Sequence, residues 1–374
     1  MKIAQIVPSL EARHGGPSRS VRGLARGLAQ SGHTVELLTT GPTVPEVMDA
    51  NSGLTLKPFE RQYPRSFACS RPLAHYLRNQ KWDIIHHHGL WLRTLHYASA
   101  EARRSSAPLV ISPRGMMSDW AWNHNRWKKR LASWFVHPGA FDCVRGWHAT
   151  SEAEGEDIRR LGFTQPVCVA PNGVVAPTET ETTAEAAHWH ALLPALSGRR
   201  VALFYSRFHA KKRVIELIDL WLSSPRDEWV LLIAGIPEQY TVAQLDTYVV
   251  RNGGSGRVII QDGVDRPPPY AIASLFLLPS HSENFGLVVA EALVRGIPVL
   301  ATDGAPWQNL NALGAGACVG WSEYGRTLTS VLAQSAADLQ AAGGRARDWA
   351  RAEFSWDKAA ATLSTFYQEL ARTG

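Results

Sequence analysis

PSHSENFGLVVAEALVRGIPVL, residues 279–300, is the stretch that decides the fold of this chain. Directly upstream, Leu275–Leu278 has the apolar run of a buried strand. A polar turn follows, and apolar residues at helical spacing then predict a helix from about Asn284. Gly296 ends that helix, and a second apolar strand opens at Val299. The order strand, turn, helix, strand predicts an α/β fold with a parallel sheet.

The polar turn is the expected ligand site, because parallel α/β sheets bind ligands at the carboxyl ends of their strands. The free N–H groups and the dipole of the following helix favour an anion such as a phosphate. Glu283 lies just before the helix and Glu291 lies eight residues later, about 12 Å along a helix. Each glutamate alone is typical of a solvated surface charge. Together, their spacing suits one carboxylate that contacts a hexose and one that contacts a ribose, with a diphosphate between them.

The string from Glu283 to Glu291, ENFGLVVAE, resembles the E-x7-E signature of the retaining glycosyltransferases of family 4, the group 1 enzymes of bacterial polysaccharide and lipid-linked glycan synthesis. The resemblance implies a GT-B fold, in which two Rossmann-like domains face each other across a cleft. The donor sugar nucleotide then sits mainly on the C-terminal domain, where Glu283 contacts the donor sugar and Glu291 binds the ribose hydroxyls. The backbone amides that would approach the sugar and the phosphates belong to Asn284, Phe285, Gly286 and Leu287.

Length and composition predict two domains and a cytoplasmic location. A chain of 374 residues exceeds the usual size of a single hydrophobic core, and 45% of its residues are hydrophobic. No apolar run reaches the length of a membrane span, and the first residues do not have the pattern of a signal peptide. The four cysteines form no C-x-x-C pair, which favours a reducing compartment and predicts neither disulfides nor a zinc site.

The net charge of +6 is unevenly distributed. Residues 1–175 hold 22 Lys and Arg against 13 Asp and Glu, a balance of +9, and the remainder holds 17 against 20, a balance of −3. This asymmetry indicates that the N-terminal half meets an anionic surface or an anionic acceptor. Charge alone would allow nucleic acid as a partner. The chain has no helix-turn-helix, zinc-finger or RNA-binding signature, so we expect no nucleic acid as a partner.

The first strand–helix turn contains a glycine pair, Gly15-Gly16, between a strand at Lys2–Val7 and a helix from about Ser18 to Gln30. The spacing is not the G-x-G-x-x-G of dinucleotide-binding proteins, which disfavours a dehydrogenase. On local evidence a plain tight turn and a close approach of backbone to ligand are equally supported. The resemblance to family 4 implies that the loop with this glycine pair closes on the donor and the acceptor.

Two polar features follow later strands of the N-terminal half. On a strand, His86 and His88 face one way and His87 the other, and no further ligands complete a zinc site. These side chains are either ordinary polar residues at a strand end, or His88 touches the acceptor or the donor. Arg114 follows a strand at Leu109–Ser112, where many family members have a histidine. Arginine cannot act as a general base, but it can neutralise a phosphate or an acidic acceptor.

A segment rich in basic and aromatic residues, 120–136, predicts an amphipathic helix. It includes Trp127, Lys128, Lys129, Arg130 and Trp134. Basic residues beside tryptophans suit a helix that lies on an anionic membrane, which would fit a lipid-linked acceptor and a peripheral position on the inner face of the cell membrane. The alternative is an ordinary helix packed on its own sheet.

Pro171-Asn172-Gly173-Val174 matches the P-N-G-V motif that ends the N-terminal domain in family 4, and the resemblance places Asn172 near the donor. The polar stretch APTETETTAEAA, 176–187, then predicts an irregular linker. We therefore expect an acceptor-binding domain at 1–175, a linker at 176–198, a donor-binding domain at 199–354, and a helix at 355–374 that crosses back onto the first domain.

Arg207 and Lys212 lie five residues apart after a predicted strand at 199–205, and two cations across one loop suit a pyrophosphate. The segment resembles the G-R-x-x-x-x-K-G element of family 4, whose Arg and Lys bind donor phosphates, with Ser206 and Arg213 in the glycine positions. No D-x-D pair follows a strand, so we expect neither a metal nor any cofactor besides the donor. Glu283, Arg207 and Lys212 are the predicted catalytic residues, and the cations would stabilise the leaving group.

These observations predict a retaining, metal-independent transfer of a hexose from a nucleotide diphosphate sugar to a hydroxyl of a glycan or lipid-linked acceptor. Two alternatives remain. One is a nucleotide-sugar epimerase or a sugar phosphate synthase on the same fold. The other is a non-catalytic subunit that binds sugar nucleotides, which the departures at Arg114 and Arg213 support.

Overall fold

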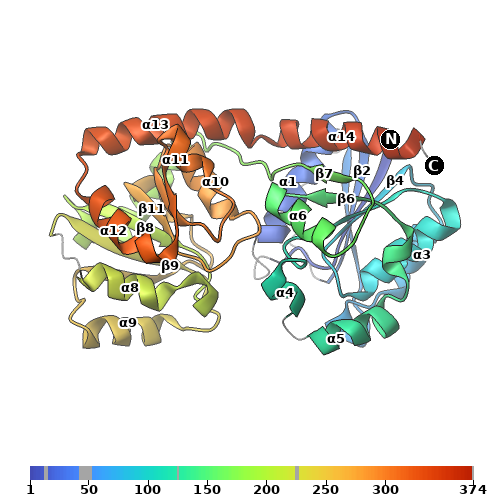
Figure 1. Ribbon diagram of the computed structural model, residues 1–374, viewed down its shortest axis with the longest axis horizontal. Coiled ribbons are helices and arrows are strands. Elements are labelled where there is room, and N and C mark those ends of the chain that lie inside the picture. Colours follow the sequence, from blue (N-terminus) through green and yellow to red (C-terminus); the bar gives the residue numbers. More distant parts are fainter. Residues whose placement is uncertain (12–15, 42–52, 124–125, 224–226, 373–374) are drawn as a thin grey trace. The chain divides into compact units, whose positions relative to one another are not determined.

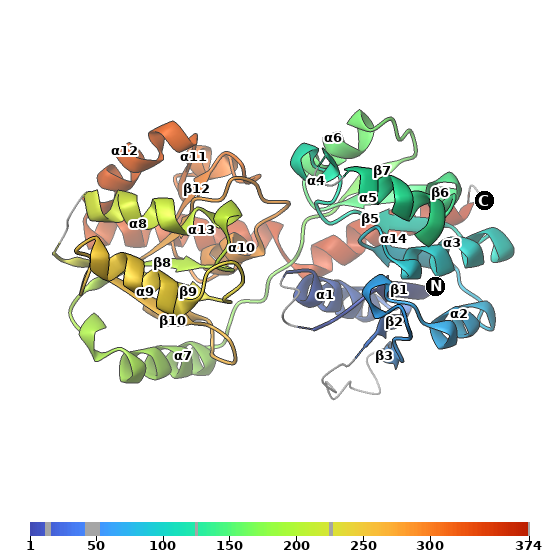
Figure 2. The ribbon, with the colours of Figure 1, turned by 90° about the horizontal axis from the view of Figure 1, so that it is seen from below.

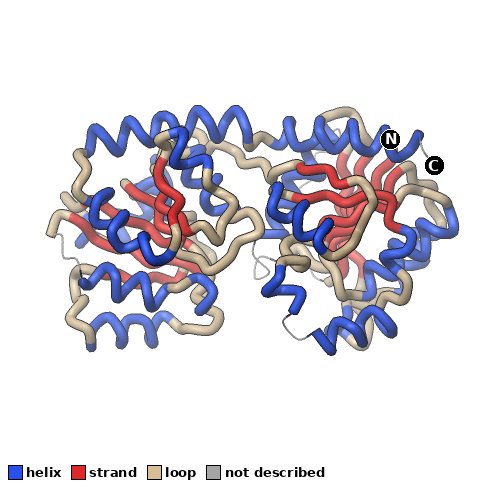
Figure 3. The backbone as a smooth tube through the Cα atoms, in the orientation of Figure 1, coloured by secondary structure: helices blue, strands red, loops and turns tan. Residues whose placement is uncertain are grey.

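The computed structural model describes residues 1–11, 16–41, 53–123, 126–223 and 227–372. The chain divides into two compact units (Figure 1). Unit 1 contains Met1–Gly173 and Phe354–Gly374, and unit 2 contains Val174–Glu353. In each unit the strands lie in the interior and helices surround them (Figure 3). Both sheets are parallel, as the motif order predicts.

Unit 1 is built on a seven-stranded sheet in the order β3-β2-β1-β4-β5-β6-β7. The strand order therefore reverses between β1 and β4. The strands are β1 (Lys2–Val7), β2 (Thr34–Thr40), β3 (Leu54–Phe59), β4 (Ile84–His88), β5 (Leu109–Ser112), β6 (Val144–Ala149) and β7 (Val167–Val169). The helices are α1 (Gly16–Gln30), α2 (Arg71–Arg78), α3 (Arg93–Ser105), α4 (Asp119–Asn123), α5 (Arg126–Leu131), a π-helical turn (Ala132–Val136), α6 (Glu152–Arg160) and α14 (Trp356–Arg372).

Both faces of this sheet are buried, because successive residues of its strands enter different hydrophobic clusters. Ile3 and Ile84 pack with α1 and α14, whereas their neighbours Ala4 and Ile85 pack with α2 and α3. This alternation explains why the strands read as continuous apolar runs in the sequence.

Unit 2 has a six-stranded sheet in the order β10-β9-β8-β11-β12-β13, which reverses between β8 and β11. The strands are β8 (Arg200–Tyr205), β9 (Trp229–Gly235), β10 (Val258–Asp262), β11 (Leu275–Leu278), β12 (Val299–Thr302) and β13 (Gly316–Val319). The helices are α7 (Glu179–Leu192), α8 (Val214–Ser223), α9 (Val242–Arg251), α10 (Leu287–Val294), α11 (Asn309–Leu313), α12 (Trp321–Leu332) and α13 (Ala336–Glu353).

The final helix, α14, crosses back to the first unit and packs against α1, as expected (Figure 1). Three glycines make room for its first residue, Trp356. A Cβ atom on Gly23 would lie 2.2 Å from the Trp356 ring, and one on Gly173 would lie 2.4 Å from the Trp356 nitrogen. On Gly27 it would lie 2.9 Å from the Trp356 carbonyl oxygen. The glycine of the P-N-G-V motif is thus required by packing against α14.

The expectation of an irregular stretch at 176–187 is wrong, because α7 occupies most of it and runs along the outside of unit 2 (Figure 2). Thr178 and Glu181 form a capping box in which the side chain of each accepts from the backbone N–H of the other. Only Glu185 and Trp189 of this helix are buried. The helix therefore lacks the apolar stripe by which an amphipathic helix is recognised in a sequence.

No helix in the part of the chain that the structure describes is long and apolar enough to cross a membrane.

Candidate functional site

The loops that follow β8 and β11 meet at the point where the strand order of unit 2 reverses. The loop after β8 holds Arg207 and ends at Lys212, and the loop after β11 holds Glu283. Open parallel sheets bind ligands at this position, because the loops on either side of a reversal diverge. The structure therefore brings Lys212 and Glu283, which are 71 residues apart, to one place.

Lys212 and Glu283 form a largely buried ion pair with a hydrogen bond. The exposed fractions of their side chains are 10% and 12%. The Ser280 hydroxyl also donates to Glu283, at 2.6 Å. Burial raises the pKa of the Glu283 carboxyl, but the charge and hydrogen bond of Lys212 outweigh it and hold the pKa below its ordinary value. Glu283 is therefore ionised at neutral pH.

Further cations surround this pair. Arg207 binds Glu238 at 3.0 Å, and both side chains are more than two-fifths exposed. Lys211 lies close enough to Glu283, Lys212 and Arg207 to feel their charges, and burial lowers its pKa. The sequence analysis did not single out Lys211, although the run Lys211-Lys212-Arg213 was visible there. Together these side chains give the loop a positive charge that suits a diphosphate.

The helix after this loop begins at Leu287 and not at Asn284 as expected. Gly286 has a φ of 75°, a left-handed conformation that a helix cannot continue through. The Trp307 indole N–H donates to the Phe285 carbonyl at 2.6 Å and fixes the turn. A Cβ on Gly286 would lie 3.2 Å from that indole nitrogen, so little space remains for a side chain. Residues 284–286 thus form an anchored turn before α10.

Glu291 lies on α10 and is oriented by a tyrosine that the sequence analysis missed. The Tyr270 hydroxyl donates to the Glu291 carboxylate at 2.8 Å and contacts the Val288 carbonyl at 3.2 Å. Tyr270 is fully buried, and burial raises its pKa well above the ordinary value. The Arg295 guanidinium lies over its ring at 4.7 Å. Tyr270 sits in a proline-rich loop 21 residues upstream, where no sequence pattern linked it to Glu291.

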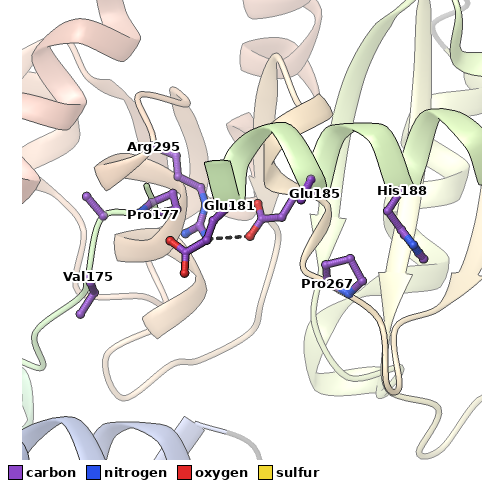
Figure 4. A pocket seen from close by; sticks show the side chains of 9 residues that line it. Val175, Pro177, Glu181, Glu185, His188, Pro267 and Arg295 are labelled. Carbon is purple, nitrogen blue, oxygen red and sulfur yellow. Dashed lines mark hydrogen bonds and ion pairs between the residues drawn. The ribbon is translucent and has the colours of Figure 1, made fainter. Parts of the chain in front are cut away.

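A cavity of about 570 Å³ lies against α7 in unit 2 (Figure 4). Arg295 and Glu185 form an ion pair at 3.3 Å in its wall. None of the predicted site residues lines this cavity. The lining residues are Val175, Ala176, Pro177, Glu181, Ala184, Glu185, His188, Pro267 and Arg295.

Unit 1 contains a buried chain of hydrogen bonds among histidines near the ends of β4, β5 and β6. His86 bonds to Tyr367 at 2.6 Å and to Ser112 at 2.7 Å, and Ser112 bonds to His148 at 2.6 Å. His148 Nε2 lies 2.9 Å from the Ala170 carbonyl, which can only accept. Its proton is therefore on Nε2, and each preceding group donates to the next. Burial lowers the pKa of His148 to about 3, so this imidazole is neutral.

His86 and His88 share one face, with ring centroids 4.2 Å apart, as predicted. His87 points to the other face, where it bonds to Thr94 at 3.0 Å. His88 Nδ1 accepts from Arg114 at 3.1 Å, so its other nitrogen carries the proton and donates to Gln5. Burial lowers the pKa of His86 and of His88 well below the ordinary value. All of these imidazoles are neutral.

Arg114 connects this network to the P-N-G-V motif, because its guanidinium also donates to Asn172 Oδ1 at 2.8 Å. The structure thus brings together His88 at the end of β4, Arg114 in the loop after β5 and Asn172 in the loop after β7. Burial lowers the pKa of Arg114 to about 10, so the guanidinium remains charged at neutral pH. Gly16 opens α1 and is exposed, whereas Gly15 lies outside the described residues.

The basic and aromatic segment exposes several of its large side chains. The exposed fractions are 61% for Trp127, 68% for Trp134 and 71% for Phe135. Lys128 is also exposed, and its ammonium lies 5.5 Å from the Trp127 ring centroid. Lys129 instead turns inward and donates to backbone carbonyls of α4. Trp127 and Trp134 therefore do not pack on the sheet of unit 1, whereas Trp122 of the same segment packs against its core.

Among the residues that the structure describes, no group of three or more His, Cys, Asp or Glu side chains is placed to hold a metal ion.

Comparisons with known proteins identify the family of the chain. Residues 15–173 match the family described as "Glycosyl transferase 4-like domain", and residues 188–319 match "Glycosyl transferases group 1". A D-inositol 3-phosphate glycosyltransferase of Xylanimonas cellulosilytica is 27% identical over 407 residues, covering 96% of this chain and 92% of that protein. The lipopolysaccharide core biosynthesis mannosyltransferase LpcC of Rhizobium leguminosarum is 29% identical over 150 residues, covering 38% and 43%.

The fold is also similar to that of Anabaena HepE, whose crystal structure contains UDP and glucose. The TM-score is 0.77 at 17% identity, and the match covers 99% of this chain and 100% of that one. Two parallel Rossmann-like sheets and a C-terminal helix that packs against α1 make this a GT-B fold. The chain belongs to the group 1, family 4-like glycosyltransferases, which are retaining enzymes that use nucleotide sugars.

Proposed function

We propose that the protein transfers a hexose from a nucleotide diphosphate sugar to a hydroxyl of a glycan or lipid-linked acceptor in bacterial surface polysaccharide synthesis. The observation that carries the proposal is the buried Lys212–Glu283 pair beside the N-terminus of α10. A lysine and a glutamate that neutralise each other can exchange partners when the donor binds. Lys212 then meets a phosphate, and Glu283 meets hydroxyls of the sugar.

The remaining side chains are assigned to the diphosphate and the ribose of the donor. Lys211 and Arg207 add positive charge near the diphosphate, and the free N–H groups of α10 add partial positive charge. Glu291, held by Tyr270, binds the ribose hydroxyls. When the bond to the sugar breaks, these cations stabilise the nucleoside diphosphate as it leaves. They supply the charge that a divalent ion would otherwise provide, and we propose that the reaction is metal-independent.

The test is a thermal-shift panel of UDP, GDP and ADP sugars with and without divalent metal, followed by transfer assays. A ligand that binds only the folded state raises the melting temperature. We expect one donor series to give a shift that does not need metal and that Lys212→Ala removes. UDP-glucose is the first donor to try, because a structure of the similar Anabaena HepE contains it. A panel without any shift would contradict the donor site.

The same assays separate the alternatives. A sugar phosphate synthase requires a phosphorylated sugar as the acceptor, whereas an epimerase converts the donor without any acceptor. A non-catalytic subunit binds the donor, but no acceptor induces turnover. Transfer to a glycan or lipid-linked hydroxyl contradicts all three.

We further propose that the exposed segment of α5 and the following π-helical turn touches the anionic inner face of the cell membrane. Trp127, Trp134 and Phe135 are large and exposed, the exposed Lys128 lies beside Trp127, and unit 1 contains the basic half of the chain. We expect the protein to sediment with vesicles that contain phosphatidylglycerol but not with phosphatidylcholine vesicles. The variant Trp127→Ser with Trp134→Ser should lose this binding. Equal sedimentation of the variant would contradict the contact.

A further inference from the structure

Arg114 is a partly buried cation whose hydrogen bonds all go to neutral groups. Two of its N–H groups donate to the Asn172 amide oxygen and to the His88 imidazole. Its Nε is buried and has no partner within the described residues. A buried guanidinium normally pairs with a carboxylate, because removing a charge from water is unfavourable unless an opposite charge compensates it.

The carboxylate whose charge acts on Arg114 is bound elsewhere. Glu154 accepts hydrogen bonds from the Gly115 N–H at 2.7 Å, from the Thr150 N–H at 2.8 Å and from the Thr150 hydroxyl at 3.0 Å. It influences Arg114 only through space. The order of donors and acceptors in the histidine network makes His86, His88 and His148 neutral. No group in direct contact with Arg114 in the described part of the chain therefore carries a negative charge.

The position of Arg114 suits a ligand contact. It lies two residues beyond the carboxyl end of β5, the strand that pairs with β4 next to the reversal of strand order in unit 1. Its φ of 55° is a left-handed conformation that is unfavourable for a residue with a side chain. The residue as a whole is partly exposed, so an anion can reach it. The amide nitrogen of Asn172 makes no hydrogen bond within the described residues and is a second donor.

We propose that Arg114 is the subsite for an oxyanion, a phosphate or a carboxylate, carried by the acceptor that receives the sugar. The planar guanidinium presents several N–H donors in a fixed geometry that matches such groups. The oxyanion supplies the negative charge that no described side chain in contact with Arg114 provides, and Asn172 donates to the same group. This inference rests on the proposed transfer, because it names the chemical class of the acceptor.

The experiment uses the full chain and inorganic phosphate as the probe. Phosphate also binds donor cations, so it is titrated in two backgrounds: the wild type with its donor site saturated by the nucleotide from the panel above, and Lys212→Gln without nucleotide. The variants are Arg114→Gln and Arg114→Lys. Arg145→Gln is the matched control, because Arg145 is an exposed arginine on β6 of the same unit. Melting temperature and calorimetry measure binding.

We expect phosphate to bind in both backgrounds. Its dissociation constant should rise about tenfold or more in Arg114→Gln, the effect of losing a charge-assisted hydrogen bond, and should rise less in Arg114→Lys. Arg145→Gln should bind phosphate as the wild type does. Equal phosphate affinity in the wild type and in Arg114→Gln, or no binding in Lys212→Gln, would overturn the proposal. If Arg114→Gln does not fold, unchanged affinity in Arg114→Lys overturns it instead.

Glucose 6-phosphate, glucuronic acid and neutral glucose then distinguish the two oxyanions. We expect one of the two charged sugars to bind more tightly than glucose, and Arg114→Gln to remove that difference. Equal binding of all three sugars would contradict the proposal. Nucleotide binding that Lys212→Gln abolishes reports on the donor site alone. A failure of the phosphate measurements is therefore distinguishable from a failure of the proposed transfer.

Discussion

At the scale of single residues, we expect substitutions of Lys212 and of Glu283 to cause different losses of ligand affinity. Lys212→Ala removes a phosphate contact, so we expect about 10- to 100-fold weaker binding of both the nucleoside diphosphate and the sugar nucleotide. Glu283→Ala removes a sugar contact, so it should weaken only the sugar nucleotide. Calorimetry with both ligands measures the difference.

The matched control for this pair is Glu323→Ala, which removes an exposed carboxylate from the surface of α12. It should leave both affinities unchanged. If Glu283→Ala weakened the nucleoside diphosphate and the sugar nucleotide equally, Glu283 would not be the sugar contact.

His148 predicts a pH dependence of stability. Its folded-state pKa of about 3 lies below the ordinary value of 6.5, so the unfolded chain binds one more proton between these values. The contribution of His148 to the free energy of unfolding is therefore fully present above about pH 6.5. It is lost as the pH falls, at about 1.4 kcal/mol per pH unit. We expect His148→Gln to unfold with a shallower pH dependence between about pH 6 and pH 5, measured by urea unfolding.

Exposed His190 is the control for this measurement. Because its side chain is exposed and lies outside the buried histidine network, His190→Gln should keep the pH dependence of the wild type. An unchanged dependence in His148→Gln would mean that its imidazole is not held neutral by burial.

At the scale of elements, α10 and the short 3-10 turn Pro269–Ile272 act together, because Tyr270 in that turn holds Glu291 on the helix. Tyr270→Phe removes one hydroxyl and keeps the ring packing. We expect this variant to bind the nucleotide about tenfold more weakly, because the Glu291 carboxylate loses its orientation toward the ribose. The loss should disappear for a 2′,3′-dideoxy nucleotide, which has no ribose hydroxyls to recognise. Calorimetry with the two nucleotides gives the comparison.

Tyr248→Phe is the matched control, because it also removes a hydroxyl that bonds to a carboxylate, Asp219, on the surface of unit 2. It should not change nucleotide affinity. A Tyr270→Phe variant that lost equal affinity for both nucleotides would have a general structural defect and not a defect in ribose recognition.

At the scale of the whole molecule, the return of α14 to unit 1 makes helical glycines sensitive to substitution. Gly23→Ala would favour the α1 helix by about 1 kcal/mol on intrinsic propensity. Its Cβ, however, would overlap the Trp356 ring, and a Cβ on Gly173 would also lie too close to Trp356. Overpacking costs about 1–3 kcal/mol, so we expect Gly23→Ala to lower the melting temperature of unit 1. Calorimetry of the full chain measures it.

Gly344 on α13 is the control, because no atom lies within 4 Å of the position that its Cβ would occupy. Gly344→Ala should therefore be neutral or stabilising. Adding Trp356→Ala should restore part of the stability that Gly23→Ala loses. If Gly23→Ala stabilised unit 1, α14 would not pack on α1 as closely as described.

The sequence alone determined the features that depend on local spacing. Apolar runs and turn residues located strands of both parallel sheets, and a helix was expected at 355–374, where α14 lies. The eight-residue spacing of Glu283 and Glu291 placed one acid before α10 and one on it. These features are predictable because a strand, a turn or a helix leaves a periodic pattern in a few neighbouring residues.

Only the tertiary structure decided which groups compensate one another. Tyr270 with Glu291, Arg114 with Asn172, and Gly23 with Trp356 are separated by 21, 58 and 333 residues, and contacts over such distances leave no periodic pattern. The α7 helix was missed because it buries few residues, and the start of α10 was misplaced because Trp307, 22 residues away, fixes the turn before it. Charge compensation and close packing depend on which segments meet in space, and that is why the chain's local pattern could locate the site but not its supporting residues.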